Sequence, residues 1–308
     1  MSHHHQAVAS PDAHPASVRV GSQRVSHPDR VIDPSTGLTK LDLVRYYESV
    51  AELMLPHLQG RPVAQVRGPQ GVRGPLFFQR HDAHADDEEA PLKISSADAL
   101  LAAAQLNVIE FHTGNARFRT ADKPDRIVFD LDPGEGAAWS QMQEGARLVR
   151  SMLQELGLQA WLKTSGGKGL HVVVPIASRW PADSLRAFSK AVVDHLAKTL
   201  PQRFVAKSGP RNRVGKIFID YLRNGSAATT VAAFSARARP GLGVSIPVAW
   251  EQLPELTSGA HWTVQTAGDH LAVEKVDPWA DYAGSRQSLG VAAKTLGLKF
   301  APRSRSRA

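Results

Sequence analysis

Two aspartates separated by one residue are the side chains best placed to act together. Asp130 and Asp132 end a β-rich run that starts at Ile127, and a Pro-Gly pair stops that run. Side chains two apart on a strand share a face, so both carboxylates point outward while Leu131 points inward. Two carboxylates this close repel each other, and a divalent cation such as Mg²⁺ or Mn²⁺ relieves the repulsion. The alternative is an ordinary Asp-Pro-Gly turn.

A third aspartate, Asp220, ends a second β-rich run, 216–221. A carboxylate from a neighbouring strand would complete an oxygen shell for two metal ions about 3.5–4 Å apart, the arrangement used by polymerases and nucleases. The alternative is a lone strand-end carboxylate paired with Arg223.

A glycine-rich segment, 165–171 with the sequence SGGKGLH, lies between two predicted strands. Glycines let backbone N–H groups approach an anion, while Ser165, Lys168 and His171 offer further donors, the last two with positive charge. The spacing of a Walker A loop is missing, and a strand follows instead of a helix. A hairpin with an exposed lysine is an equally acceptable interpretation.

Basic and aromatic side chains indicate a polyanionic ligand. The basic residues around Asp220 are Arg211, Arg213, Lys216, Arg223, Arg237 and Arg239. They fit a triphosphate or a nucleic-acid backbone, and a solvated surface is the alternative, which is favoured for Arg239. Phe77 and Phe78 are adjacent, so at least one ring is expected to face away from the core, where it could stack on a base. His112 at a strand end is either a ligand contact or a structural histidine.

Interleaved helices and strands must position these groups. Apolar spacing predicts helices over about 39–57, 96–105, 139–156 and 182–200, with Thr39 as the first N-cap. Short β-rich runs predict strands near 63–66, 108–111, 127–132, 159–163, 170–175 and 216–221. The acidic stretch 82–89 is expected to be a solvated loop. The predicted class is α+β or mixed α/β.

Composition narrows the possible functions. The 308 residues include no cysteine, which excludes disulfide scaffolds, Cys-ligated zinc, iron–sulfur clusters and thiol nucleophiles. A hydrophobic content of 42% excludes a largely disordered chain, and a net charge of +8 favours a polyanionic partner. Neither a membrane-spanning run nor a signal-peptide core is present in the sequence, so a soluble cytoplasmic protein is expected.

Three segments are predicted along the chain. Residues 1–22 are small, polar and without a period, and are expected to be a disordered linker or a tag remnant. Residues 23–300 would form one catalytic domain, and residues 301–308 a basic tail.

Together the motifs resemble the polymerase (primase-like) domain of bacterial ATP-dependent DNA ligase D, in the archaeo-eukaryotic primase superfamily. The segments that carry the resemblance are SHPDRV (26–31), GLTK (37–40), FFQ (77–79), FDLDPG (129–134), TSGGKGLH (164–171) and KIFIDY (216–221). The resemblance implies a primase-polymerase core of two packed α/β modules, with the active site in the cleft between them. It also implies addition of ribonucleotides or deoxyribonucleotides to DNA 3′ ends in nonhomologous end joining, including gap filling and templated or untemplated extension.

The resemblance also implies residue roles. Asp130, Asp132 and Asp220 would be catalytic and would hold two Mn²⁺ or Mg²⁺ ions, with Mn²⁺ favoured. The residues that would bind the nucleotide are His112, Ser165, Lys168, His171, Arg223 and Arg237. The residues that would bind DNA are His27, Arg30, Lys40, Arg67, Phe77, Phe78, Arg213 and Lys216.

Arg30 and Lys40 would hold the 5′-phosphate of a DNA break. They flank a Pro/Gly turn before the first helix, and backbone N–H groups at the start of that helix would add to the anion site. From the residues alone, two solvated surface side chains are the default interpretation.

The expected substrates are DNA double-strand-break ends, with a 5′-phosphate and a 3′-OH primer, and NTP or dNTP. The expected protein partners are Ku and the ligase and phosphoesterase domains of a longer polypeptide. No membrane partner is expected, and the expected location is the bacterial nucleoid. The Lys-x-Asp-Gly motif of the ligase is absent from the sequence, so nick sealing is not expected. Two rivals remain. A metal-dependent nuclease or phosphoesterase needs no triphosphate site, and a non-enzymatic DNA-end-binding module would gain nothing from paired carboxylates, which repel phosphate.

Overall fold

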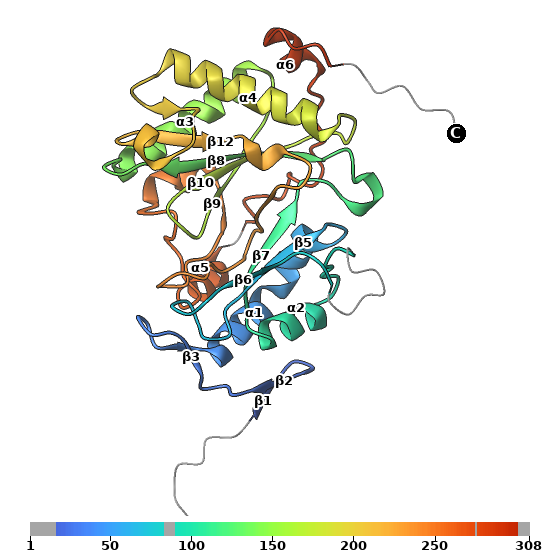
Figure 1. Cartoon of the computed structure of the whole chain (residues 1–308), viewed down its shortest axis with the longest axis vertical. Coiled ribbons are helices and arrows are strands. Elements are labelled where there is room, and N and C mark those ends of the chain that lie inside the picture. Colours follow the sequence, from blue (N-terminus) through green and yellow to red (C-terminus); the bar gives the residue numbers. More distant parts are fainter. Residues whose placement is uncertain (1–16, 83–89, 275, 301–308) are drawn as a thin grey trace, which may run out of the picture.

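The larger of the two main sheets forms one half of the molecule (Figure 1), and the described residues also contain two two-stranded sheets. The computed structural model describes residues 17–82, 90–274 and 276–300. The strand order of the larger sheet is β11-β12-β8-β10-β9-β14, and only the β11–β12 pair is parallel. Its strands are β8 (Arg126–Pro133), β9 (Trp161–Thr164), β10 (Leu170–Pro175), β11 (Phe204–Val205), β12 (Ile217–Asp220) and β14 (Pro247–Val248).

The smaller sheet is antiparallel, with the order β13-β7-β5-β6. Its strands are β5 (Val63–Arg67), β6 (Phe77–Gln79), β7 (Val108–Gly114) and β13 (Thr229–Val231). In this sheet β6 is an edge strand, and the side chains of Phe77 and Phe78 are exposed on it.

Helices cover both sheets, as Figure 1 shows. α1 (Lys40–Leu58) and α2 (Ala97–Gln105) pack on each other and on β7, while α3 (Trp139–Glu155) contacts β8, β10 and β12. α4 (Ala182–Thr199) contacts β8 and β11, and α5 (Ala267–Val273) and α6 (Gly290–Thr295) follow near the C-terminus. The four long helices lie where the apolar spacing predicts them, because that spacing gives each one a face to bury.

α1 joins the smaller sheet to a segment late in the chain. The Tyr47 hydroxyl donates to the carbonyl of Ile109 on β7 and accepts from the N–H of Ala236, at 2.5 and 3.1 Å. The Tyr46 hydroxyl donates to the carbonyl of Phe234 at 2.7 Å. The two tyrosines therefore fix α1 to the segment that leads into Arg237.

The predicted mixed α/β class with two packed modules is confirmed. One continuous cluster of buried hydrophobic residues includes Phe111 of the smaller sheet and Phe129 of the larger sheet, so the modules share a core. In the described part of the chain, no helix is both long enough and apolar enough to cross a membrane.

The predicted boundary of the N-terminal linker is wrong. β1 (Ser17–Val20) pairs with β2 (Gln23–Ser26), and this hairpin packs on α1 and α2. Strands of four residues give too short an alternation to stand out in the sequence. Residues 1–16, 83–89 and 301–308 lie outside the described residues, so the remaining linker, most of the acidic loop and the basic tail stay predictions.

Candidate active site

Strand pairing brings the three predicted aspartates to one place. Asp130 and Asp132 lie on β8, and Asp220 on β12 is the direct cross-strand partner of Asp130. On the other side of β8, His171 of β10 is also paired with Asp130. Leu131 between the aspartates is fully buried, as the alternation predicts. The antiparallel register, rather than proximity in sequence, therefore builds the site.

The negative charge of the three carboxylates is only partly balanced by the positive side chains around them. Burial and the adjacent charge of Asp130 raise the pKa of Asp132 to about 6. Burial also raises the pKa of Asp220, although Arg223 acts against that rise. Burial opposes ionisation of Asp130, but His171 and Arg223 outweigh it and hold the pKa of Asp130 below its usual range. Additional positive charge would be favourable here.

Two arginines act as counterions of the carboxylates in the structure, and one histidine lies beside them. Arg223 Nε lies 3.2 Å from Asp130 Oδ2 and 3.1 Å from Asp220 Oδ2. Arg213 Nη1 lies 3.6 Å from Asp132 Oδ2, and His171 Nε2 lies 3.2 Å from Asp130 Oδ1. Arg213 was predicted to bind DNA and Arg223 the nucleotide, and here both face carboxylates.

The donor chemistry of the aspartates fits a hard divalent cation. Carboxylate oxygens are the preferred ligands of Mg²⁺ and Mn²⁺, and burial, with the charge of Asp130 adding to it, raises the pKa values of Asp132 and Asp220. Within residues 17–82, 90–274 and 276–300, however, no three acidic or histidine side chains are already gathered around one metal position. The arginine contacts occupy the carboxylate oxygens instead.

The glycine-rich loop packs directly against β8. A side chain at Gly169 would meet the carbonyl oxygen of Leu131 at 2.0 Å and would lie 3.5 Å from Asp132 Oδ1, so only glycine fits there. The Ser165 hydroxyl accepts from the N–H groups of Gly167 and Gly169, both at 3.1 Å, which shapes the loop and leaves its proton to donate elsewhere. Lys168 is exposed at the tip.

His171 differs from its prediction as a positively charged donor. The side chain is 3% exposed, and burial lowers its pKa to about 4, with the charge of Lys163 adding to the effect. The imidazole is therefore neutral at neutral pH. Its Nδ1 has no hydrogen-bond partner among the described residues.

Arg237 is held between two elements. Its Nη1 donates to the carbonyl of Ser165, and its Nε donates to Glu110 Oε2, each at 3.0 Å. The same Glu110 oxygen lies 2.6 Å from Nε2 of His112. The sequence analysis missed Glu110, although its position two residues before His112 on a predicted strand placed both side chains on one face.

Lys163 is a second buried residue that the sequence analysis missed. Its Nζ donates to the carbonyl of Val231 at 3.0 Å and to the Ser245 hydroxyl at 2.6 Å. Burial lowers the pKa of Lys163 well below its usual range. Its position beside Trp161 and Leu162 in a β-rich run gave no signal for a role near the carboxylates.

A cavity of about 950 Å³ opens beside Asp132. Four cations line it: Lys168 from the glycine-rich loop, Arg211 and Arg213 from the 3₁₀ segment Pro210–Arg213, and Arg239 from the segment after β13 (Thr229–Val231). Arg239 is exposed, as predicted, yet it borders this cavity. Space and positive charge next to a carboxylate cluster suit a polyphosphate.

Some of the predicted DNA-binding residues lie together at the edge of the smaller sheet, and others lie elsewhere on the molecule. Phe77 and Phe78 are 56% and 51% exposed, so both rings face away from the core. Arg67 is the cross-strand partner of Phe77 and donates to the carbonyl of Leu106 at 3.2 Å. His27 is exposed and Lys216 is partly exposed beside β12, and the contacts of both with DNA stay predictions.

The predicted anion site at the start of α1 is wrong in its backbone part. The N–H groups of Lys40 and Leu41 donate to the carbonyls of Arg30 and Pro28, and the N–H of Asp42 donates to the Thr39 hydroxyl. The first N–H groups of the helix therefore already have partners.

The two cations predicted there also contact protein. Lys40 is 2% exposed and donates to the carbonyl of Ser26 at 2.9 Å, while Arg30 donates to the carbonyl of Pro69 at 3.1 Å. Burial, with the nearby charge of Arg30, lowers the pKa of Lys40 to about 8. The two positive charges are thus close to each other, as a phosphate site requires.

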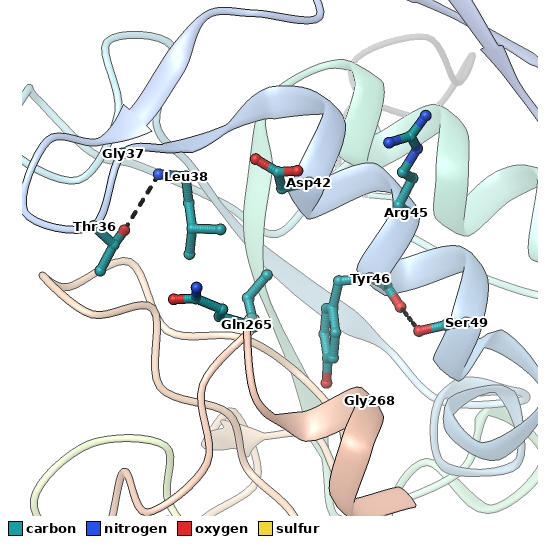
Figure 2. A pocket seen from close by; sticks show the side chains of 10 residues that line it. Thr36, Gly37, Leu38, Asp42, Arg45, Tyr46, Ser49, Gln265 and Gly268 are labelled. Carbon is teal, nitrogen blue, oxygen red and sulfur yellow. Dashed lines mark hydrogen bonds between the residues drawn. The ribbon is translucent and has the colours of Figure 1, made fainter. Parts of the chain in front are cut away.

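A separate cavity of about 530 Å³ lies between the turn after β3 (Val31–Asp33), α1 and α5 (Figure 2). Figure 2 shows Tyr46 of α1 and Gly268 of α5 on its walls. None of the residues predicted for catalysis, nucleotide binding or DNA binding lines it.

The site combines paired carboxylates on a central strand, a glycine-rich loop beside them and a cation-lined cavity, which together suit a divalent cation and a polyphosphate. A family model described as "LigD, primase-polymerase domain" matches residues 39–279. The chain belongs to the LigD primase-polymerase domain family. Membership favours the nucleotidyltransferase over the nuclease and the non-enzymatic rivals.

Individual relatives agree with this family. The multifunctional non-homologous end joining protein LigD of Pseudomonas aeruginosa is 48% identical over 88% of this chain and 34% of its own length. The protein of the same name from Mycolicibacterium smegmatis is 34% identical over 88% of this chain and 39% of its own length. The polymerase domain of Mycobacterium tuberculosis ligase D, solved in complex with DNA, is 32% identical with a TM-score of 0.74, covering 82% of this chain and 94% of that chain. The chain thus spans little more than a third of these curated relatives.

Proposed function

We propose that this chain extends the 3′ ends of DNA at double-strand breaks, with NTP or dNTP as substrate, in nonhomologous end joining. The observation that carries the proposal is the strand register that sets Asp220 and His171 opposite Asp130, with the glycine-rich loop packed beside Asp132. The names of the relatives, end-joining proteins and a polymerase domain in complex with DNA, support the same function.

Asp130, Asp132 and Asp220 would hold two Mn²⁺ or Mg²⁺ ions. When bound, the ions would lower the pKa of the primer 3′-OH and neutralise the leaving pyrophosphate. For these ligands to be free, Arg223 and Arg213 must release the carboxylate oxygens that they now contact. Both guanidinium groups would then be available for phosphate.

The chain's own residues would bind and orient the nucleotide. Lys168 would contact the triphosphate, with the Ser165 proton as a further donor and Arg237 as a planar donor pair. Attack by the 3′ oxygen forms a bond to the α-phosphorus and breaks its bond to the β-phosphate oxygen. The cation-lined cavity beside Asp132 would accept the pyrophosphate.

The 5′-phosphate of the DNA break would be held away from the carboxylates that act on the 3′-OH. Arg30 and Lys40 would bind a 5′-phosphate, and the exposed rings of Phe77 and Phe78 would stack on bases. The remaining DNA contacts would come from His27, Arg67, Arg213 and Lys216. The chain would act with Ku and with the ligase and phosphoesterase domains of a longer polypeptide. Its location would be the nucleoid of a bacterial cytoplasm.

Primer extension tests the proposal directly. Purified protein is incubated with a labelled duplex carrying a 3′ overhang, with NTP or dNTP, and with Mg²⁺ or Mn²⁺. We expect nucleotide addition that requires a divalent cation and is lost in Asp132→Asn. No addition with any combination of metal and nucleotide would refute the proposed function.

A further inference from the structure

The Glu110 carboxylate connects two groups that belong to different parts of the site. Oε2 lies 2.6 Å from His112 Nε2 and 3.0 Å from Arg237 Nε, and Oε1 accepts from the N–H of Ala238 at 2.7 Å. The side chain of Glu110 is 7% exposed. Burying a carboxylate is costly unless its oxygens are well bonded, and here both oxygens are.

The hydrogen bond to Glu110 fixes the tautomer of His112. Burial opposes ionisation of Glu110, but the hydrogen bond from His112 and the charge of Arg237 lower the pKa of Glu110 to about 2, so the carboxylate is ionised. An ionised carboxylate only accepts hydrogen bonds, so Nε2 of His112 must carry the proton. Burial lowers the pKa of His112, so the ring is neutral and its Nδ1 is an acceptor.

The other partner of Glu110 leads to the glycine-rich loop. Arg237 uses Nε for Glu110 and Nη1 for the carbonyl of Ser165, so its guanidinium plane is fixed at two points. The backbone of the arginine is fixed as well, because the N–H of the next residue, Ala238, donates to Glu110. One carboxylate thus sets both the plane and the position of this arginine.

The His112 partner leads to the exposed aromatic edge. The His112 ring meets the Phe78 ring edge-on, with 6.2 Å between centroids, and the Arg80 guanidinium lies 5.0 Å from the centroid of Phe78. His112 therefore stands between the strand proposed to contact DNA and the carboxylate that orients Arg237. A hydroxyl group brought to Nδ1 would find an acceptor of fixed orientation.

From this geometry we infer that Glu110 is a positioning residue of the reaction: it holds His112 in its Nε2–H form, with Nδ1 presented to a hydroxyl of the primer or of the nucleotide sugar, and it holds Arg237 toward the triphosphate. The identity of these substrates rests on the proposed function. Glu110 itself touches neither substrate, and its effect passes through His112 and Arg237.

Double-mutant cycles test the inference in kinetics. Nucleotide addition is measured with saturating DNA and varied NTP. Glu110→Gln keeps the size of the side chain and removes its charge, and we expect kcat to fall about tenfold or more, with a higher KM for NTP. Glu110→Gln should lower kcat no further in His112→Ala, and should raise KM no further in Arg237→Ala. Glu155→Gln, at an exposed position of α3, is the control.

A second measurement does not depend on activity. Two-bond ¹H–¹⁵N spectra of the histidine rings, with His112 assigned by its loss in His112→Ala, report the tautomer. We expect the Nε2–H form in the wild-type protein and a mixture of tautomers in Glu110→Gln. Urea unfolding shows whether Glu110→Gln is folded. If Glu110→Gln is unfolded, Glu110→Asp, which keeps the charge but has a shorter side chain, is used in both measurements instead.

The outcomes separate the two proposals. If the wild-type protein adds no nucleotide, the proposed function fails and the spectra alone decide the role of Glu110. If the wild-type protein is active, additive effects in either cycle overturn the inference. An Nδ1–H form of His112 in the wild-type protein overturns it in every case.

Discussion

The carboxylate region and the proposed end-binding region are built in opposite ways. On β8, β10 and β12, the candidate catalytic and nucleotide-binding side chains occupy directly paired strand positions, and Asp130 contacts a histidine and an arginine. Near the start of α1, by contrast, Arg30 and Lys40 bond to backbone carbonyls of their own chain. In the first region strand register already gathers the carboxylates, and metal ions would have to displace only the arginine side chains that contact them, whereas in the second region a phosphate must compete with backbone carbonyls.

The difference separates interactions that stabilise the transition state from interactions that set the affinity for DNA. Groups that act on a transition state must be fixed in advance, and strand register supplies that fixation. Groups that recognise a DNA end act on affinity, where partial exposure and adjustment are tolerated. Substitutions in the carboxylate region should therefore change kcat, and substitutions in the end-binding region should change the Kd for DNA.

The largest effect is expected for Asp130→Asn. The amide keeps the shape of the side chain but removes a charge that the proposed metal ions need, so extension should fall at least about a hundredfold with DNA binding retained. Gel-based extension and DNA titration measure the two quantities. Asp194→Asn on α4, where Asp194 pairs with Lys190, serves as the control. Extension above a tenth of the wild-type rate, with Mg²⁺ or Mn²⁺, would contradict the role of Asp130.

Gly169→Ala should have the next largest effect. The new methyl group would meet the carbonyl of Leu131 at 2.0 Å, so the loop must move away from Asp132. We expect kcat/KM for the nucleotide to fall about tenfold or more, with Kd for DNA unchanged. Gly268→Ala is the matched control, because a methyl group there meets nothing within 4 Å. Equal effects on nucleotide and DNA would remove the contrast between the regions.

The end-binding region should show a pH-dependent preference for a 5′-phosphate. Recessed ends with a 5′-phosphate should bind about tenfold more tightly than 5′-hydroxyl ends at pH 7, and Lys40→Ala should erase most of this preference. A lysine loses its charge above its pKa, which is about 8 for Lys40. The preference should therefore fall as pH rises above about 8, by up to about tenfold per pH unit.

Fluorescence anisotropy across pH 7–9.5 measures this preference. The 5′-phosphate is already mostly doubly ionised at pH 7 and only gains charge as the pH rises, so a decline in the preference reports the protein. Lys198→Ala, at an exposed position of α4, should behave as wild type. A preference that is absent at low salt, or that grows with pH, would return Arg30 and Lys40 to a structural role.

The smallest effect separates two neighbouring rings. Phe77→Ala and Phe78→Ala should each weaken DNA binding by about fivefold, near 1 kcal/mol. Only Phe78→Ala should also lower kcat, because only that ring contacts His112 among the ring pairs of the described residues. Val291→Ala, at a position 78% exposed on α6, is the control. Identical kinetic behaviour of the two phenylalanine variants would mean that the contact with His112 has no catalytic consequence.

Local patterns in the sequence predicted much of the molecule. The helices followed from apolar spacing, and the shared face of Asp130 and Asp132 followed from the period of a strand. The glycine-rich loop predicted that backbone N–H groups can approach an anion. The close contact between Gly169 and Leu131 could not be predicted, because it depends on how the loop packs on β8.

Features set by distant pairings could not be predicted. The sequence gives no register, so it could not show that Asp220 and His171 face Asp130, or that Glu110 meets Arg237, 127 residues later. The N–H groups at the start of α1 seemed free because their acceptors, the carbonyls of Arg30 and Pro28, come from a turn of unknown shape.

The tyrosine contacts of α1 have a mechanical consequence. α1 begins at Lys40 and, within two turns, Tyr46 and Tyr47 bond to the segment just before Arg237. A helix has a fixed rise per residue, so α1 sets the separation between the proposed DNA-end site and the proposed nucleotide site. A DNA end whose 5′-phosphate and 3′-hydroxyl match that separation would reach both proposed sites at once, and one with a different separation would reach only one of them.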